Sequence, residues 1–210
     1  PSPLLTRTKG GTMRASERGV SLAELAVVLA ILGALFLISI PALSEILAEE
    51  SLATAAREVA AILHAARARA VFQGVDVGVK WVANAGDLVL TVYQDGNANG
   101  VTTADIRKGV DRLVAGPYWL GSRYPGVAFS FVPGMDGTDP GGAPIGNLSD
   151  PVRFGRSNIC TFSPVGHASP GTVYLSNRRN RQAAVRVTPI NAKIQIWTWH
   201  GKKLKWIARW

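Results

Sequence analysis

The sequence is poor in the residues that build disulfides, metal sites and most catalytic centres. It contains one cysteine, Cys160, and three histidines, so no intramolecular disulfide forms and no histidine cluster with metal-ligand spacing occurs. Cys160 lies in an apolar stretch, which favours a buried structural thiol over a reactive one. No nucleophile elbow and no phosphate-binding loop motif is present. We therefore expect a protein that is not an enzyme and that uses no cofactor.

One stretch of the chain lacks charged residues altogether, and another lacks negatively charged residues. No charged side chain occurs between Leu25 and Ser44, and no Asp or Glu follows Asp150. Eleven Lys or Arg residues lie between Arg153 and Arg209, and the whole chain has a net charge of +9. The first stretch suits an apolar environment, whereas the basic C-terminal part suits an anionic partner.

The uncharged stretch is 20 residues long, and about 20 apolar residues are enough for a helix to cross ~30 Å of hydrocarbon. Glu24 stands directly before it, where a lone carboxylate costs roughly 2.5–3.5 kcal/mol on insertion scales. A secretory signal peptide has a shorter apolar region with a small-residue cleavage site behind it, whereas Gly19 lies before this one. A plain signal anchor explains the apolar stretch but neither Gly19 nor Glu24.

The order Gly19, Ser21, Leu22 and Glu24, followed by a long apolar helix, resembles the N-terminal signal of the type IV pilin-like superfamily. The resemblance implies that prepilin peptidase cleaves between Gly19 and Val20 on the cytoplasmic side, and that the new N-terminus is methylated. Val20 stands where this superfamily more often has Phe. The expected partners are other pilins of the filament, prepilin peptidase and the inner-membrane assembly platform.

The resemblance divides the chain into four parts. Residues 1–19 are the leader, with Met13 as an alternative start, and residues 20–44 form the transmembrane and filament-core helix. Residues 45–74 are the amphipathic half of the same helix, and residues 75–210 are a β-rich globular domain. Basic leader residues hold that end in the cytoplasm. The protein is therefore expected in the bacterial inner membrane, with a single pass and a periplasmic C-terminal domain.

Two residues of the apolar helix have expected roles in filament assembly. A buried carboxylate is tolerated when it is paired with a buried cation, and the free amine of a neighbour's Val20 is the natural partner. We therefore expect Glu24 to set the axial register of assembly. Pro41 lies where many members of the superfamily carry a helix-kinking proline.

The fold class predicted from periodicity is α+β, with a long N-terminal helix packed on an antiparallel, sandwich-like domain. Apolar residues recur at three- and four-residue steps as far as Phe72, and Gly74 is the expected C-cap. The period then changes to two, which predicts a hairpin over 75–81 and 87–93. Further strands are predicted at 127–132, 152–154, 172–175, 183–187, 193–199 and 203–207, with a surface loop at 133–151.

The C-terminal part resembles the GspH/FimT family of minor pilins and pseudopilins. A Phe-Ser-Pro-Val-Gly motif at 162–166 before a strand, and closing strands near 185–187 and 193–196, carry this resemblance. It implies a structural subunit of a type II secretion pseudopilus or a type IV pilus. The alternative function is that of a DNA receptor in natural transformation. The resemblance implies this alternative, since minor pilins of the FimT type in DNA-uptake machines bind DNA through a C-terminal G-R-x-R motif. The aligned residues here are Ala192-Lys193-Ile194-Gln195.

Basic and aromatic residues interleave at the C-terminus and form a candidate DNA-binding set. Cations beside stacking surfaces suit single strands, and cations alone suit the duplex backbone. The alternative is that the tryptophans pack on the helix while the cations keep a strand edge solvated. The candidate residues are Lys193, Lys202, Lys203, Lys205, Arg209, Trp197 and Trp199.

A D-x-N-x-N-G stretch between two predicted elements is a second candidate site. Oxygen ligands at alternate positions, with Gly at the sixth, suit a calcium loop. The closing acid should stand at the twelfth position, but Ile106 holds that place and the acid comes one residue early. The same residue types also build ordinary turns, so both interpretations stay open. The candidate ligands are Asp95, Asn97, Asn99 and Asp105.

Overall fold

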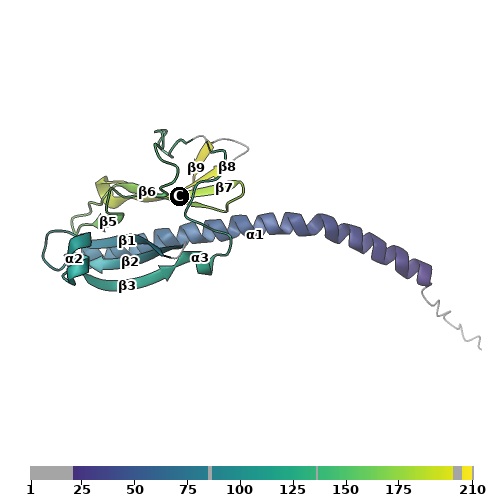
Figure 1. Cartoon of the computed structure of the whole chain (residues 1–210), viewed down its shortest axis with the longest axis horizontal. Helices are drawn as coiled ribbons and strands as arrows, with labels where there is room; N and C mark the ends of the chain where they lie inside the picture. Colours follow the sequence, from purple (N-terminus) through teal and green to yellow (C-terminus); the bar gives the residue numbers. More distant parts are fainter. Residues whose placement is uncertain (1–20, 85–86, 136, 201–204, 210) are drawn as a thin grey trace, which may run out of the picture. The chain divides into compact units, whose positions relative to one another are not determined.

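The structure, a computed structural model, describes residues 21–84, 87–135, 137–200 and 205–209 (Figure 1). The chain divides between Leu43 and Ser44 into two compact units. The helices are α1 (Leu22–Gln73), α2 (Thr103–Lys108) and α3 (Leu120–Arg123), with a 3₁₀ turn η1 (Ile190–Ala192). The strands are β1 (Val77–Asn84), β2 (Asp87–Gln94), β3 (Arg112–Trp119), β4 (Val152–Arg153), β5 (Ile159–Phe162), β6 (Gly171–Ser176), β7 (Arg181–Val187), β8 (Ile194–His200) and β9 (Lys205–Ala208).

Helix α1 has a defined cap at each end. Ser21 Oγ accepts the Ala23 N–H at 3.3 Å, which is the usual role of a serine N-cap. At the other end Gly74 has φ +68°, and its N–H donates to the Ala70 carbonyl at 3.0 Å. The predicted long helix, with Gly74 directly after it, is confirmed over the described residues.

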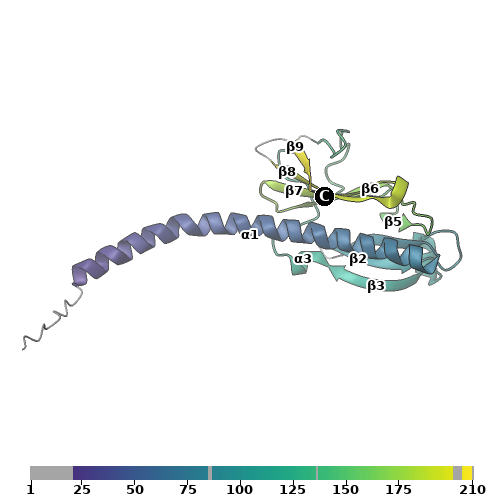
Figure 2. The same ribbon diagram turned by 180° about the vertical axis from the view of Figure 1, so that it is seen from behind.

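The rear half of α1, whose buried residues run from Leu52 to Ala70, lies between two sheets (Figures 1 and 2). Its buried residues follow the helical repeat, so one broad apolar stripe meets both sheets. Five of them are alanines, Ala55, Ala56, Ala60, Ala66 and Ala70, and such small side chains let sheets approach a helix closely. The predicted stripe is buried at every position: Leu52, Ala56, Val59, Leu63, Ala66 and Ala70.

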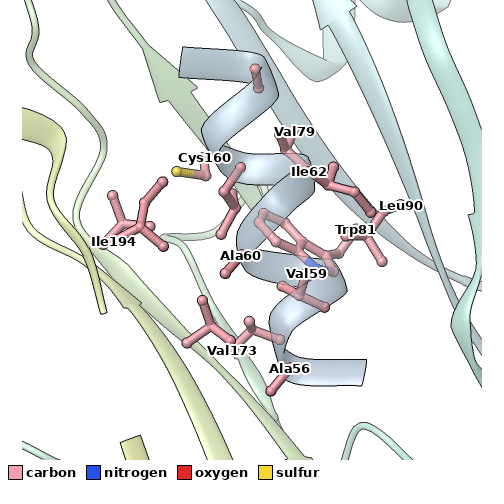
Figure 3. Close-up of a cluster of buried hydrophobic side chains, with 14 of the residues drawn as sticks. Ala56, Val59, Ala60, Ile62, Val79, Trp81, Leu90, Cys160, Val173 and Ile194 are labelled. Carbon is pink, nitrogen blue, oxygen red and sulfur yellow. The ribbon is translucent and has the colours of Figure 1, made fainter. Parts of the chain in front are cut away.

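The strands form two antiparallel sheets, which confirms the predicted α+β class with antiparallel pairing, and the rear half of α1 lies between these sheets. The first sheet has the order β3-β2-β1-β5, and the second has the order β4-β6-β7-β8-β9. The predicted hairpin is confirmed by the β1–β2 pairing, which runs from Val77↔Gln94 to Asn84↔Asp87. Figure 3 shows Val79, Trp81 and Leu90 of the first sheet beside α1, together with Cys160, Val173 and Ile194. Trp81 also stacks on Phe154, with ring centroids 4.7 Å apart.

The strand predicted at 127–132 is wrong. Ala128 makes an isolated bridge with Ser176, and the other end of the same β6 edge pairs with β4. Residues 127–151, of which 136 lies outside the described residues, are here called the cover segment. The segment begins in the core around α1, where Val127 is buried, and then contributes Val132, Met135 and Ile145 to the face of the second sheet that points away from α1. A second apolar cluster forms beneath this segment from Val132, Met135, Ile145, Tyr174, Ala184 and Trp199.

Sequence analysis assigned no strand to β3 or β5 and no helix to α2. In β3, Gly116-Pro117 interrupts the alternation, and the register against β2 shifts at this point. A proline is tolerated here because β3 is an edge strand, where a missing N–H breaks fewer ladder bonds. Strand β5 is 4 residues long and α2 is 6, too short to show a clear period.

The core position of α1 generates a stability prediction. Val59 is 0% exposed between the sheets, whereas Val71 on the same helix is 55% exposed. Val59→Ala should lower the free energy of unfolding by about 2 kcal/mol, because two methyl groups and their contacts are lost. Chemical denaturation of the full chain in a mild detergent measures this difference. Val71→Ala is the matched control and should stay near the wild-type value, and equal losses would contradict the packing described.

Candidate functional surfaces

The described residues of the N-terminal signal, Ser21, Leu22 and Glu24, form the start of helix α1. Gly19 and Val20, the predicted cleavage and methylation residues, lie outside the described residues. Ser21 is the N-cap of α1, and Glu24 follows three residues later in the first helical turn. This spacing is that of a capping box, and a carboxylate in the first turn also interacts favourably with the helix dipole. The position of Glu24 therefore suits a local capping role, which the sequence predictions above did not include.

The front part of α1 presents its large apolar side chains to the surroundings. Between Leu22 and Leu37 these side chains are 44% to 87% exposed. Within the described part of the chain, no helix is both long and apolar enough to cross a membrane. The predicted span of 20–44 includes Val20, which lies outside the described residues. The structure also does not describe the side chains of residues 38–42, so the expected role of Pro41 stays a prediction.

The candidate calcium loop is organised by its own backbone. Asp95 Oδ1 accepts the N–H groups of Asn97 and Ala98 at 2.9 and 3.1 Å, and Oδ2 accepts the Gly100 N–H at 2.8 Å. These contacts are those of an Asx turn. The Asp95 carboxylate is thus occupied by N–H donors, which a cation would have to displace.

The carboxylates at the C-terminal end of the loop, Asp105 and Asp111, also accept hydrogen bonds from within the loop. Asp105 N–H donates to Thr102 Oγ1 at 3.1 Å, and Asp105 Oδ2 accepts from that hydroxyl and from Asn99 Nδ2 at 2.8 and 3.1 Å. Asp111, which sequence analysis missed, accepts the N–H groups of Gly96 and Thr102. Among the described residues, no group of three or more His, Cys, Asp or Glu could hold a metal ion. The geometry favours the turn interpretation.

The candidate tryptophans pack beneath the cover segment and not on α1. Trp199 is 2% exposed in the second apolar cluster, and Trp197 is half-buried against it. Trp206 Nε1 donates to the Thr138 carbonyl at 2.7 Å. The indole N–H groups of Trp197 and Trp199 have no hydrogen-bond partner in the described part of the chain. A buried Trp199 cannot stack on a nucleic-acid base.

The described cations of the candidate DNA-binding set do not form one patch. Lys193 directly precedes β8, whereas Lys205 pairs with His200 at the opposite end of that strand. Arg209 Nε donates to Thr198 Oγ1 at 3.3 Å, on the other face of the sheet from Trp197 and Trp199. Lys202 and Lys203 lie outside the described residues.

Cys160 is buried, as its apolar surroundings predict. It is 0% exposed, and its Sγ lies 3.6 Å from the Ser169 carbonyl oxygen. Burial raises the pKa of the Cys160 thiol far above its ordinary value, so the nucleophilic thiolate does not form at neutral pH. Its role is structural.

The pilin-like assignment depends on the N-terminal signal at Gly19, Ser21, Leu22 and Glu24 and on the α+β architecture. No known family model matches the chain, and neither a curated protein nor a solved structure shows significant similarity to it. The family, the processing and the function therefore stay predictions.

The geometry of the 95–111 loop predicts that calcium does not bind. Titration of the full chain with calcium to millimolar concentration should release no heat in calorimetry, because the Asp95 and Asp105 carboxylates already accept hydrogen bonds. Asp95→Ala should lower the free energy of unfolding by about 1–3 kcal/mol, since backbone donors lose their acceptor. Saturable heat that disappears in Asp105→Asn would contradict this prediction.

The same loop should weaken in acid. Hydrogen bonds from Thr102 and then Asn99 hold the pKa of Asp105 below its ordinary value of 3.8. A depressed native pKa means that the carboxylate stabilises the fold above pH 3.8 and that this stabilisation is lost as pH falls through the native pKa. Asp105→Asn should flatten this acid dependence of the unfolding midpoint. Glu50→Gln, at an exposed helix position, should leave the dependence unchanged.

Proposed function

We propose that this chain is a minor pilin or pseudopilin, a structural subunit of a type II secretion pseudopilus or a type IV pilus. The observation that carries the proposal is the contrast along α1. Its rear half is buried between two sheets, whereas its front half exposes leucine, valine, isoleucine and phenylalanine side chains. One helix thus belongs to two different environments.

The exposed front half needs a second apolar environment. Full burial of one such side chain contributes about 1.5–3 kcal/mol, and monomeric soluble proteins rarely leave a large contiguous apolar surface uncovered. Lipid supplies that environment before assembly, and the helices of neighbouring subunits supply it within a filament. The charge-free sequence from 25 to 44 suits both.

Processing follows from the residues that precede the helix. Prepilin peptidase cleaves after Gly19 and methylates Val20, and the helix cap at Ser21 then lies at the second residue of the mature chain. The single-pass subunit stays in the inner membrane with residues 45–210 in the periplasm until the assembly platform incorporates it.

Glu24 supplies assembly with a directional contact. In a bundle of apolar helices its carboxylate pairs with the N-terminal amine of a neighbouring subunit, which satisfies two charges that would otherwise be buried alone. Loss of one partner of a buried ion pair costs about 3–5 kcal/mol. The capping box is a local alternative for the same residue, and it needs a hydrogen-bonding group but no charge.

The DNA-receptor alternative has no comparable observation in its favour among the described residues. Trp199 is buried, and the exposed cations Lys193, Lys205 and Arg209 lie apart. We retain this alternative as a prediction and favour the structural role.

Cleavage of the leader tests the proposed processing. Co-expression of the full chain with a prepilin peptidase should yield an N-terminal peptide that begins with methylated Val20, identified by mass spectrometry. Gly19→Leu should block cleavage, whereas Ala15→Leu, also within the leader, should not. Cleavage elsewhere, or none in the wild type, would contradict the proposal.

The role of Glu24 is tested by two substitutions that separate charge from capping. Glu24→Gln keeps a capping-box side chain but cannot form an ion pair, whereas Glu24→Ala removes both. Both variants should insert in the membrane normally and enter sheared filaments at least tenfold less than wild type, because the ion pair is worth more than about 1.4 kcal/mol.

Glu50→Gln is the matched control for this experiment, since Glu50 is an exposed acid of the same helix beyond the apolar part. It should assemble like wild type. Normal assembly of Glu24→Gln with defective Glu24→Ala would assign Glu24 to capping and remove the ion-pair hypothesis.

A further inference from the structure

A row of polar side chains crosses the second sheet on the face away from α1. The register pairs Arg153 with Thr172, Thr172 with Arg186, and Arg186 with Gln195. Directly paired residues share one face, so these four side chains lie next to each other on β4, β6, β7 and β8. The next row on this face, Tyr174, Ala184 and Trp197, belongs to the apolar cluster under the cover segment.

The polar row borders a hollow of about 370 Å³. Asp139 and Ile145 of the cover segment line one side of it, and Arg153, Thr172 and Arg186 line the sheet side. Tyr174 also contributes to the lining, and burial raises its pKa to about 12. Its phenol is therefore protonated at neutral pH and can donate a hydrogen bond.

The two guanidinium groups are only partly used by the protein. Arg153 Nη1 donates to the Asn147 carbonyl at 3.3 Å, and Arg186 Nη1 reaches Asp139 Oδ2 at 3.4 Å, which is long for a charged pair. Each guanidinium carries five N–H donors. Both side chains are half-buried, so their access to water is restricted.

Asp139 does not offset both charges. Its Oδ1 accepts the N–H groups of Gly141 and Ala143 at 2.8 Å each, which fixes the carboxylate in its own turn. It is the acid among the residues that line the hollow, against two arginines.

From this juxtaposition we propose that the hollow, here called the Arg153–Arg186 pocket, binds a phosphate group. Arg153 and Arg186 flank Thr172 in the register, and their two guanidinium groups can each take oxygens of one tetrahedral anion, whereas a planar carboxylate uses a single guanidinium. Thr172 and Tyr174, which also line the hollow, supply neutral hydroxyl groups beside the guanidinium groups. The site is separate from α1 and goes beyond the proposed structural role.

Calorimetric titration of the full chain in a non-ionic detergent with inorganic phosphate tests this site. Wild type should show saturable binding at low salt. Arg153→Gln and Arg186→Gln should each weaken it by about tenfold or more, because a charge-assisted hydrogen-bonding group is lost. Arg178→Gln and Arg179→Gln, which alter exposed arginines of the β6–β7 turn, should bind like wild type.

Asp139→Asn provides an independent arm that retains both arginines. The Asn Oδ1 can still accept the turn N–H groups, while the carboxylate charge beside the pocket is removed. Phosphate should bind several-fold more tightly to this variant. No saturable binding by wild type, equal losses in the two control variants, or weaker binding by Asp139→Asn would each overturn the proposal.

The source of the phosphate group is distinguished by competition. A short oligonucleotide, or vesicles that contain an anionic phospholipid, are added at saturating phosphate, and displacement by either one identifies the natural source. If neither displaces it, the pocket takes a small phosphate ester. The pocket is contradicted if wild type binds no phosphate while the oligonucleotide or the vesicles bind equally well to wild type and to the Arg153→Gln, Arg186→Gln double variant. If the protein does not bind phosphate, the proposed filament role is unaffected, because leader cleavage and filament assembly are measured in separate experiments.

Discussion

The structure of residues 44–210 depends on the packing of one alanine-rich helix stripe between two sheets. Ala56 and Ala60 place little volume between the helix and its neighbours, while Val59 and Leu63 fill the space that remains. Both sheets therefore share a single core with α1 (Figure 3). The stacked rings of Trp81 and Phe154 join the two sheets directly. A larger side chain at an alanine would separate both sheets from the helix.

This arrangement gives the second sheet two different faces. Its inner face belongs to the core around α1, whereas its outer face carries tryptophans, a tyrosine and arginines and packs its aromatic side chains against the cover segment. The cover segment buries the aromatic part and leaves the polar row at the edge of a hollow. Within the described part of the chain the indole N–H groups of Trp197 and Trp199 have no hydrogen-bond partner, and a buried donor without a partner costs about 1–3 kcal/mol.

The same helix connects the fold to the proposed function. Its rear half is buried in the core, whereas its front half exposes large apolar side chains. Helix capping at Ser21 and a carboxylate in the first turn are local features, yet Glu24 is also the one charged residue of the helix sequence before Glu45. A structural role in a filament uses both properties, and it requires no catalytic group.

The sequence by itself determined the long helix, its buried stripe, the hairpin and the α+β class, because these depend on local periodicity and on caps such as Gly74. It also predicted the buried Cys160 thiol. It could not place the cover segment, since Val127–Val132 has a strand-like alternation and only the occupied edge of β6 excludes it from the ladder. Nor could it bring Arg153 and Arg186 together, because two residues far apart in sequence become neighbours only through strand register. The burial of Trp199 was likewise decided by tertiary structure, since alternation shows which residues share a face but not which face is covered.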